Sequence, residues 1–217
     1  MVGSSDICLG SSDISAASLP INRKLLTLAV VNDGSRVLLG LKKRGFGEGY
    51  YNGFGGKVEE GETIDQAAVR ELKEEAGISP IGMTKLGILI FHFDDKPCPW
   101  EVHVFNVPEF TGEPCESDEM LPTWFAHEQI PFGYFGHVME TNFSMVFHVQ
   151  RLLAVETLHC AVVFLSLTIL DGKPQQMWKD DTVWYPLFLK GQKFKGEFFF
   201  QDTHKLFSYK CEAVESL

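Results

Sequence analysis

The sequence of 217 residues predicts an α+β fold, in which β-hairpins build a mixed sheet and a few helices cover its faces. Short apolar runs lie in pairs on either side of turn residues, as in β-hairpins, whereas only two segments have the pattern of a helix. The strands do not alternate regularly with helices, which argues against a doubly wound nucleotide-binding fold. Hydrophobic residues make up 45% of the chain, enough for a substantial core.

A β-hairpin is the first predicted element. The apolar residues 25–31 and 37–41 flank the turn sequence NDGS at 32–35. The segment from Gly45 to Gly56 follows, and half of its residues are glycine. Such a composition predicts a loop whose backbone bends tightly or approaches a ligand closely, although an ordinary surface turn could have it too.

The best-defined helix is expected from Thr63 to Ala76. Thr63 and Gln66 form a capping-box pair at its start, and Gly77 follows its last residue. The later elements are three strands, a short helix and a final hairpin: Leu86–Phe93, Glu101–Val107 and Thr123–Phe125, a helix after Asp181, and strands at 196–200 and 206–211 around a polar turn.

The charge and cysteine content exclude several classes of protein. With 19 basic and 29 acidic side chains the net charge is −10, so polymeric nucleic acid and anionic membranes repel the chain. A polyanionic substrate would need metal ions or a local basic pocket. The cysteines are scattered, with no Cys-x-x-Cys pair, which argues against a disulfide framework or zinc site and favours a reducing compartment. They are Cys8, Cys98, Cys115, Cys160 and Cys211.

Three glutamates on the predicted helix carry the first chemical signal. Glu71, Glu74 and Glu75 stand at i, i+3 and i+4 and share one helical face, which overlaps the apolar arc. Glu71 and Glu75 are therefore expected to point toward the protein body. A solvated acidic face is the alternative, but it would not align with the apolar arc, and like charges at this spacing repel. Clustered carboxylates near an apolar interior favour a hard divalent cation such as Mg²⁺.

The loop before this helix has the features of a phosphate site. Phe54-Gly55-Gly56-Lys57 combines small residues, whose backbone can approach phosphate oxygens, with a lysine that can neutralise them. Residues 42–44, Lys-Lys-Arg, add a local basic cluster in an acidic chain. Together the glutamates and this loop predict a metal–phosphate site.

The segment Gly56 to Ile78 matches the pattern G-x5-E-x7-R-E-U-x-E-E-x-G-U, where U is aliphatic, at every specified position. In this respect the chain resembles the Nudix hydrolases. The resemblance implies a Nudix α/β/α sandwich with a mixed β-sheet and a catalytic loop–helix–loop. It also implies an enzyme that cleaves phosphorus-containing anhydrides in a small nucleotide.

Further stretches resemble the animal oxidised purine nucleoside triphosphate hydrolases, the 8-oxo-dGTP diphosphatases related to bacterial MutT. These stretches are LLGLKKRGFGEGYYNGFGGKVEEGET, EVHVF at 101–105, ESDEM at 116–120 and WKDDTVWYPL at 178–187. The resemblance implies sanitation of the nucleotide pool, by hydrolysis of 8-oxo-dGTP or 2-hydroxy-dATP to monophosphate and pyrophosphate. It also implies a monomer without a membrane span, located in the cytoplasm, with the nucleus or mitochondrial matrix as alternatives.

The same resemblance implies the residues of the metal site. The ligands of Mg²⁺, or of Mn²⁺ in its place, are expected to be Glu71, Glu74, Glu75, Glu119 and the carbonyl of Gly55. Arg70 matches the arginine that orients the carboxylates. Glu75 is expected to be the most rate-critical carboxylate, while the residue that removes the proton from water stays open between Glu75, Glu74 and Glu119.

The resemblance also implies that four residues recognise the base, and their side chains have the chemistry to do so. Asn52 offers an amide donor and acceptor, Trp178 a stacking plane, and Asp180 with Asp181 a carboxylate pair that cannot easily ionise twice. One carboxyl could then donate a hydrogen bond to the base while the other accepts; alternatively, the pair caps a helix. The other positions that match the substrate pocket are Thr27, Lys42, Phe46, Phe54, Gly55, Gly56, Lys57, Phe91 and Met120.

Two additions are expected to interrupt or extend a single domain at 23–217. Residues 1–22 are serine-rich, contain no Lys or Arg, and predict a disordered extension rather than a targeting leader. Residues 133–176 form an apolar insertion just before Trp178. It is a folded excursion, a partner or membrane-surface element, or a segment without a selected structure. Two alternatives for function follow: a variant that binds nucleotide with little turnover, or a hydrolase of another nucleoside diphosphate derivative.

Overall fold

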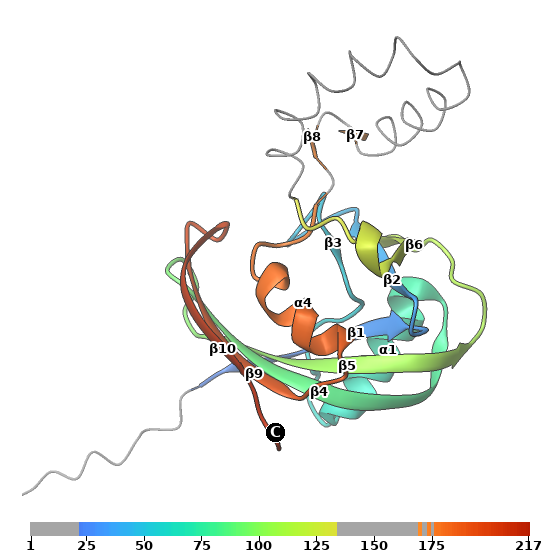
Figure 1. Cartoon of the computed structure of the whole chain (residues 1–217), viewed down its shortest axis with the longest axis horizontal. Helices are drawn as coiled ribbons and strands as arrows, with labels where there is room; N and C mark the ends of the chain where they lie inside the picture. The colour runs from blue at the N-terminus through green and yellow to red at the C-terminus, as the bar shows by residue number, and fades with distance from the viewer. Residues whose placement is uncertain (1–21, 134–168, 171–172, 175) are drawn as a thin grey trace, which may run out of the picture.

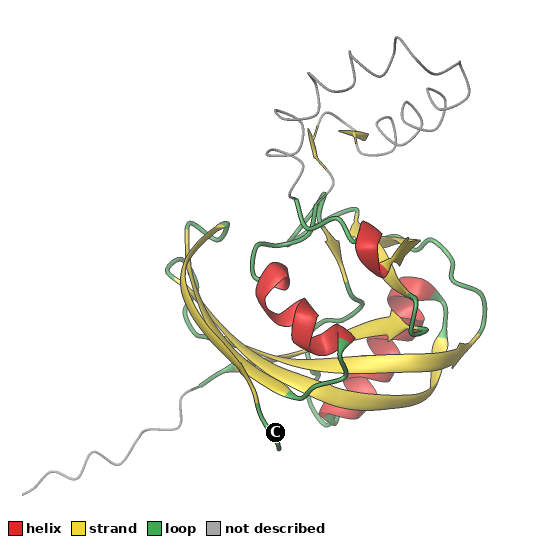
Figure 2. Cartoon of the chain, viewed as in Figure 1, coloured by secondary structure: helices red, strands yellow, loops and turns green. Residues whose placement is uncertain are grey.

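The computed structural model describes residues 22–133, 169–170, 173–174 and 176–217. The strands are β1 (Lys24–Asn32), β2 (Arg36–Lys42), β3 (Tyr51–Asn52), β4 (Ser79–Phe93), β5 (Trp100–Thr111), β6 (Met120–Ala126), β7 (Ile169–Leu170), β8 (Lys173–Pro174), β9 (Phe194–Gln201) and β10 (Lys205–Ala213). The helices are α1 (Ile64–Ala76), α4 (Asp181–Leu189) and the short 3₁₀ helix η1 (His127–Gln129). Strands dominate the described chain, as Figure 2 shows.

The predicted first hairpin is confirmed. β1 and β2 pair antiparallel near their turn, where Val31 faces Leu38. One carboxylate oxygen of Asp33 accepts from the backbone amides of Ser35 (2.9 Å) and Arg36 (2.8 Å), which fixes the turn. Beyond the turn the two strands separate: β1 pairs parallel with β5, and β2 pairs antiparallel with β6.

The sheet is mixed, as the sequence predicts. Its strand order is β10-β9-β4-β5-β1-β2-β3, with β6 paired to β2. The β1–β5 and β4–β9 pairs are parallel, and the other pairs are antiparallel. β4 and β5 extend well beyond their predicted ranges, because each supplies the other with backbone hydrogen bonds whatever the polarity of the side chains.

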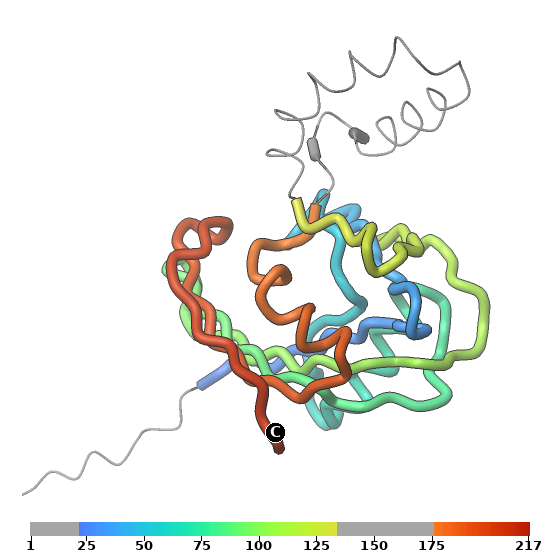
Figure 3. Tube along the Cα trace, in the orientation of Figure 1, coloured from blue at the N-terminus to red at the C-terminus, as the bar shows by residue number. Residues whose placement is uncertain are grey.

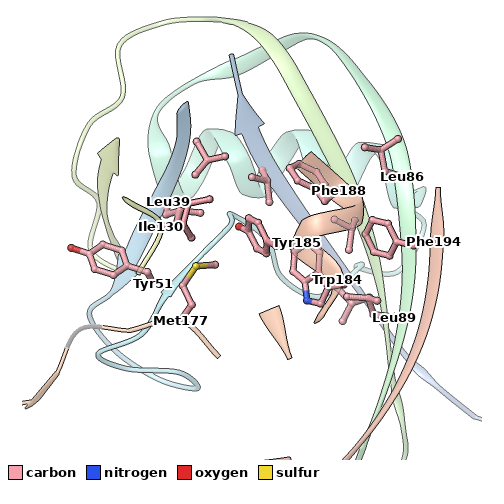
Figure 4. Close-up of a cluster of buried hydrophobic side chains, with 14 of the residues drawn as sticks. Leu39, Tyr51, Leu86, Leu89, Ile130, Met177, Trp184, Tyr185, Phe188 and Phe194 are labelled. Atoms are coloured by element: carbon pink, nitrogen blue, oxygen red, sulfur yellow. The ribbon is translucent and has the colours of Figure 1, made fainter. Parts of the chain in front are cut away.

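A helix covers each face of the sheet, which makes the predicted sandwich. α4 lies on the concave side in Figure 1, where Trp184, Tyr185 and Phe188 pack against sheet residues such as Phe194 and Leu89 (Figure 4). α1 packs on the opposite side through a second cluster. That cluster contains Ala29, Val31, Leu38, Phe54, Ala68, Leu72, Ala76, Ile78, Phe105, Val107 and Met120.

The caps of α1 confirm the expected helix. The hydroxyl of Thr63 accepts from the amide of Gln66 (3.2 Å), and the side chain of Gln66 accepts from the amide of Thr63 (2.8 Å). Gly77 ends the helix in the left-handed conformation, with φ at 75°. The sequence pattern missed β3 and η1, because elements of two or three residues are too short to show a periodicity.

The two ends of the predicted insertion meet. The amide of Met177 donates to the carbonyl of Pro131 (2.9 Å), and the amide of Tyr51 donates to the carbonyl of Gln176 (3.0 Å). Figure 3 accordingly shows the chain returning beside the point where it left. Within 133–176, β7 and β8 pair antiparallel, while most of this range lies outside the described residues, as does the predicted extension apart from Asn22. In the described part of the chain no helix is both long and apolar enough to cross a membrane.

Candidate active site

A cavity of about 490 Å³ lies between the glycine-rich loop, the sheet and the start of α4. It brings together most of the residues that the sequence predicts, although they come from six separate parts of the chain. The predicted residues that line it are Thr27, Lys42, Phe46, Asn52, Gly55, Gly56, Lys57, Phe91, Glu119, Met120, Trp178, Asp180 and Asp181.

Glu75 lies at the centre of the carboxylate cluster beside this cavity. It is only 4% exposed, and its two oxygens accept from Nζ of Lys42 (2.9 Å) and from the amide of Gly55 (2.8 Å). The same ammonium donates to Glu119 (2.8 Å), which also accepts from Arg44 (2.9 Å). Glu75 and Glu119, which are far apart in sequence, are therefore joined around one positive charge.

Arg70 organises the other carboxylates. Its guanidinium donates to both oxygens of Glu62 (2.9 and 3.0 Å), to Glu71 (2.8 Å) and to Glu74 (3.1 Å). It also donates to the carbonyl of Lys57 (3.0 Å), which ties the helix to the glycine-rich loop. Such a fork of donors holds the glutamates in place, and Glu62 takes part in it although sequence reasoning gave this residue no role.

Burial and the neighbouring cations shift the pKa values of these carboxyls in opposite directions. Burial raises the pKa of Glu75 above its usual value, against the lowering effect of the Lys42 charge. Burial likewise raises the pKa of Glu71, with Arg70 acting in the opposite direction. The pKa of Glu119 is lowered, chiefly by its hydrogen bond from Lys42. As predicted, Glu71 and Glu75 face inward, whereas the side chain of Glu74 is 59% exposed.

The oxygen atoms of these glutamates and of the glycine-rich loop are of the chemical type that binds a divalent cation. A Cβ at Gly56 would collide with the carboxylate of Glu71, so only glycine leaves the backbone free beside that oxygen. Carboxylates and a loop carbonyl are the oxygen ligands that hard cations prefer. In the described ranges, however, no three acidic, His or Cys side chains converge on one point as metal ligands. Here Lys42 and Arg70 neutralise the glutamates instead.

Asp180 and Asp181 form the opposite, buried end of the cavity. They are 5% and 2% exposed. The indole of Trp184 donates to Asp180 (3.2 Å), and the amide of Trp178 donates to Asp181 (2.9 Å). Asp180 stands at the N-cap position of α4, but its side chain makes no capping hydrogen bond, so the helix-cap alternative is wrong.

Burial also raises the pKa of both aspartates. The pKa of Asp180 rises to about 6, and that of Asp181 rises well above its usual value, because burial disfavours its charge and Asp180 repels it. At least one of the two carboxyls therefore holds a proton near neutral pH. A neutral carboxyl donates a hydrogen bond and a carboxylate accepts one, so the pair can bind a donor and an acceptor together.

Aromatic rings surround the space between these two ends. Phe46 stacks on Trp178 with ring centroids 5.2 Å apart, and Tyr50 stacks on the same indole at 4.4 Å. His204, from the turn between β9 and β10, lies parallel to it at 5.5 Å. Trp100, at the start of β5, contacts Phe46 at 4.8 Å. Sequence reasoning missed Tyr50, Trp100 and His204. Tyr50 lies inside one of the resembling stretches and Trp100 directly precedes another, so their positions were the available signal, whereas His204 lies far from any motif.

Two of the predicted pocket residues behave differently from the rest. Phe54 does not line the cavity, because its ring is fully buried against α1 while its backbone pairs with Ala29. This side chain is a core residue, and the prediction that it contacts substrate needs correction. Thr27 is buried at the cavity wall, and its hydroxyl has no hydrogen-bond partner within the described chain, so it is available to a ligand.

Comparisons with known proteins identify the family. The family model described as NUDIX domain matches residues 23–141. The oxidized purine nucleoside triphosphate hydrolase of Danio rerio is 40% identical over 194 residues, covering 89% of this chain and 97% of that protein. The Mus musculus protein of the same name is 39% identical over 193 residues, with the same two coverages.

A solved structure agrees with the fold. The MutT protein from Bacillus halodurans superposes with a TM-score of 0.60 at 23% sequence identity, covering 87% of this chain and 97% of that one. The domain match spans more than half of this chain, and the two animal relatives are aligned over almost their whole length. The glutamate-bearing helix α1 and the glycine-rich loop both lie within the matched domain. The chain therefore belongs to the Nudix hydrolases.

Proposed function

We propose that this protein hydrolyses oxidised purine nucleoside triphosphates, of the 8-oxo-dGTP and 2-hydroxy-dATP type, to monophosphate and pyrophosphate. Two animal relatives that are about 40% identical carry this activity in their names. One feature of the site supports it most directly: a single cavity joins a buried aspartate pair to the glycine-rich loop and Glu119. A base and a polyphosphate on one nucleotide could occupy these two ends together.

The aspartate end suits an oxidised purine. Oxidation at C8 or C2 changes which edge atoms of the purine donate and which accept hydrogen bonds. Asp180 and Asp181, with one proton between them, offer a donor and an acceptor, and the amide of Asn52 offers both as well. Trp178 and Phe46 supply ring faces for the base. This arrangement would accept more than one oxidised purine.

The glutamate end suits the triphosphate. Glu71, Glu74, Glu75 and Glu119 would hold Mg²⁺, or Mn²⁺ in its place, with the carbonyl of Gly55 as a further ligand. When bound, the ion supplies positive charge to the phosphate oxygens and lowers the pKa of the attacking water. Lys57 and the backbone of Gly56 would bind phosphate oxygens directly.

Glu75 is the carboxylate to which we assign the most rate-critical role. Its burial raises its pKa, which makes it a stronger base than an exposed glutamate. Arg70 keeps the neighbouring carboxylates in position through four of its hydrogen bonds. Attack of water at the β-phosphorus would then release pyrophosphate.

A substrate panel tests this function. The purified protein with Mg²⁺ is incubated with normal and oxidised purine triphosphates, a nucleotide sugar and a dinucleotide, and the products are separated by chromatography. Release of monophosphate and pyrophosphate, fastest from the oxidised purines, is the expected result. Faster cleavage of the nucleotide sugar or dinucleotide would identify a Nudix hydrolase of another nucleoside diphosphate derivative. Binding without turnover would identify a nonproductive variant.

We also propose the oligomeric state and the cellular compartment in which the protein acts. We expect a monomer that acts on free nucleotides in the cytoplasm, with the nucleus and mitochondrial matrix as alternatives, and not on polymeric nucleic acid. Among the described residues Cys98, Cys115 and Cys211 are free thiols. Light scattering of the purified protein and imaging of the tagged chain in animal cells would test these two expectations.

A further inference from the structure

Four cationic side chains line the cavity, and only two of them are paired with carboxylates. Lys42 is bound to Glu75 and Glu119, and Arg44 is bound to Glu119. The other two, Lys24 and Lys57, make no ion pair within the described part of the chain. In a protein with a net charge of −10, two unpaired lysines in one cavity point to an anionic ligand.

The backbone places these two lysines on the same side of β1. Lys57 pairs with Leu26 in an antiparallel bridge, and directly opposed residues direct their side chains to the same face. Lys24 precedes Leu26 by two residues on the strand, so it shares that face. The segment 55–57 runs along β1 toward Lys24, since the amide of Val58 donates to the carbonyl of Leu25 (3.0 Å). A phosphate chain that followed this segment would end near Lys24.

Lys24 is also held in place by an aromatic ring. Its Nζ lies 4.4 Å from the ring centroid of Trp100, which is its neighbour on β5 in the register of the sheet. Trp100 in turn packs against Phe46 and Phe93, with ring centroids 4.8 and 5.0 Å away. The half-buried lysine therefore loses less side-chain freedom when it binds an anion than a fully exposed lysine would.

We propose that Lys24, positioned by Trp100, is a further substrate-binding residue that contacts the terminal phosphate of the triphosphate and so favours triphosphates over shorter nucleotides. This inference rests on the proposed function and deepens it. The terminal phosphate leaves within pyrophosphate, so Lys24 would bind the substrate and this product but not the nucleoside monophosphate. Lys24 stands two residues along β1 from Leu26, the bridge partner of Lys57, so the contact adds affinity on the same wall of the cavity as Lys57.

Charge variants of Lys24 test the inference. Lys24→Met removes the charge but keeps a long apolar side chain over Trp100, and Lys24→Arg restores the charge. Lys85→Met is the matched control, because Lys85 also lies over a ring, that of Phe105 at 5.5 Å, but does not line the cavity. KM, kcat and the inhibition constants of pyrophosphate and of the nucleoside monophosphate are measured for each variant.

The expected result is specific to the terminal phosphate. In Lys24→Met the KM for the triphosphate and the inhibition constant of pyrophosphate rise about tenfold, the size expected for one charge-assisted hydrogen bond. The inhibition constant of the monophosphate stays within about twofold of the parent value. Lys24→Arg recovers most of the loss, and Lys85→Met behaves as the parent protein. Unchanged KM and pyrophosphate inhibition in Lys24→Met would overturn the inference while leaving the proposed hydrolysis intact.

A binding measurement separates this inference from a failure of the proposed function. If the parent protein cleaves no triphosphate, the proposed function fails, and the same variants are titrated with inorganic tripolyphosphate and Mg²⁺ by calorimetry. Weaker binding to Lys24→Met than to Lys85→Met would still support a phosphate contact at Lys24. Equal binding to both variants, or no binding to the parent protein, would contradict it.

Discussion

At the scale of single residues, Glu75 combines a charge with nearly complete burial. Its carboxylate is stabilised by Lys42 and by the amide of Gly55, both within 2.9 Å. Glu75→Gln keeps the shape of the side chain and removes its charge. We expect kcat to fall by roughly 10²–10⁴-fold, the range for loss of a positioned acid or base, while the protein stays folded. Pyrophosphate release at saturating substrate measures this effect.

Glu60→Gln is the control for this change. Glu60 is exposed, lies in the turn before α1 and has no role in the proposed site, so its kcat should match that of the parent chain. If Glu75→Gln were as fast as Glu60→Gln, the assignment of Glu75 would be wrong. A low melting temperature for Glu75→Gln alone would indicate that the carboxylate serves the fold instead.

Asp180 makes stability depend on pH in a direction opposite to that of an ordinary paired carboxylate. Burial raises its pKa from 3.8 to about 6, so the folded state holds the proton more tightly than the unfolded state. The free energy of unfolding therefore falls as pH rises from about 4 to 6, by about 3 kcal/mol for a shift of this size. Above that range the contribution is constant.

Asp180→Asn removes this titration, and urea unfolding at several pH values measures the change. Relative to the parent protein, the variant should gain stability between pH 4 and pH 6, because its neutral amide carries no penalty for burial of a charge. The difference between the two proteins reports on the aspartate pair, because loss of the Asp180 charge also lowers the pKa of Asp181. It cancels the contributions of carboxyls with lowered pKa values, such as Glu101, which have the opposite sign. Parallel stability curves for the two proteins would exclude a raised pKa at Asp180.

At the scale of elements, the end of α1 depends on a glycine for two separate reasons. Gly77 has φ at 75°, which a residue with a Cβ adopts at a cost of about 1–2 kcal/mol. A Cβ there would also collide with Sγ of Cys115. Gly77→Ala should therefore lower the free energy of unfolding by more than Gly61→Ala. Gly61 has φ at 83° but open space around its Cβ position.

Cys115→Ala separates the two causes. It removes the sulfur atom, so Gly77→Ala should cost less in the Cys115→Ala background, and the remaining cost should approach that of Gly61→Ala. Thermal unfolding of the four variants and the parent protein forms a double-mutant cycle with its control. Equal costs of Gly77→Ala in both backgrounds would show that α1 shifts away from Cys115 freely.

At the scale of the whole molecule, the predicted insertion joins the domain through a narrow junction. Pro131 and Met177 are bound by a backbone hydrogen bond of 2.9 Å, and Gln176 is bound to Tyr51. Joining Gly133 directly to Gln176 would make the Pro131–Met177 bond an i to i+4 turn, which a chain can form readily. We expect deletion of residues 134–175 to leave kcat/KM for the preferred substrate within a few-fold of the parent value.

This deletion also distinguishes the alternatives for the insertion. A loss of activity of 100-fold or more, on the order of 3 kcal/mol in transition-state binding, would mean that the segment supports the aspartate pair that follows it. A gain of similar size would mean that the full chain is the poorly active variant. Steady-state kinetics on both proteins, with circular dichroism to confirm the fold, measures the outcome.

Much of the fold follows from local pattern. The hairpin turn at Asp33, the capping box at Thr63 and the final hairpin are where the sequence predicts them, because each depends on residues that are neighbours in the chain. The helical spacing of the glutamates relative to the apolar arc likewise predicted which of them face inward. The strand ends were predicted less well, since β4 and β5 continue through polar residues as far as their partners can bond to them.

The sequence by itself determined the family, the glutamate helix and the glycine-rich loop, because these lie within one stretch of chain. Only the tertiary structure decided that Lys42 joins Glu75 to Glu119, that Phe54 belongs to the core, and that Lys24 and Trp100 stand at the same cavity. Such contacts depend on strand register and sheet order, which bring distant segments together. A local pattern of side chains does not determine which distant strands pair or in which register.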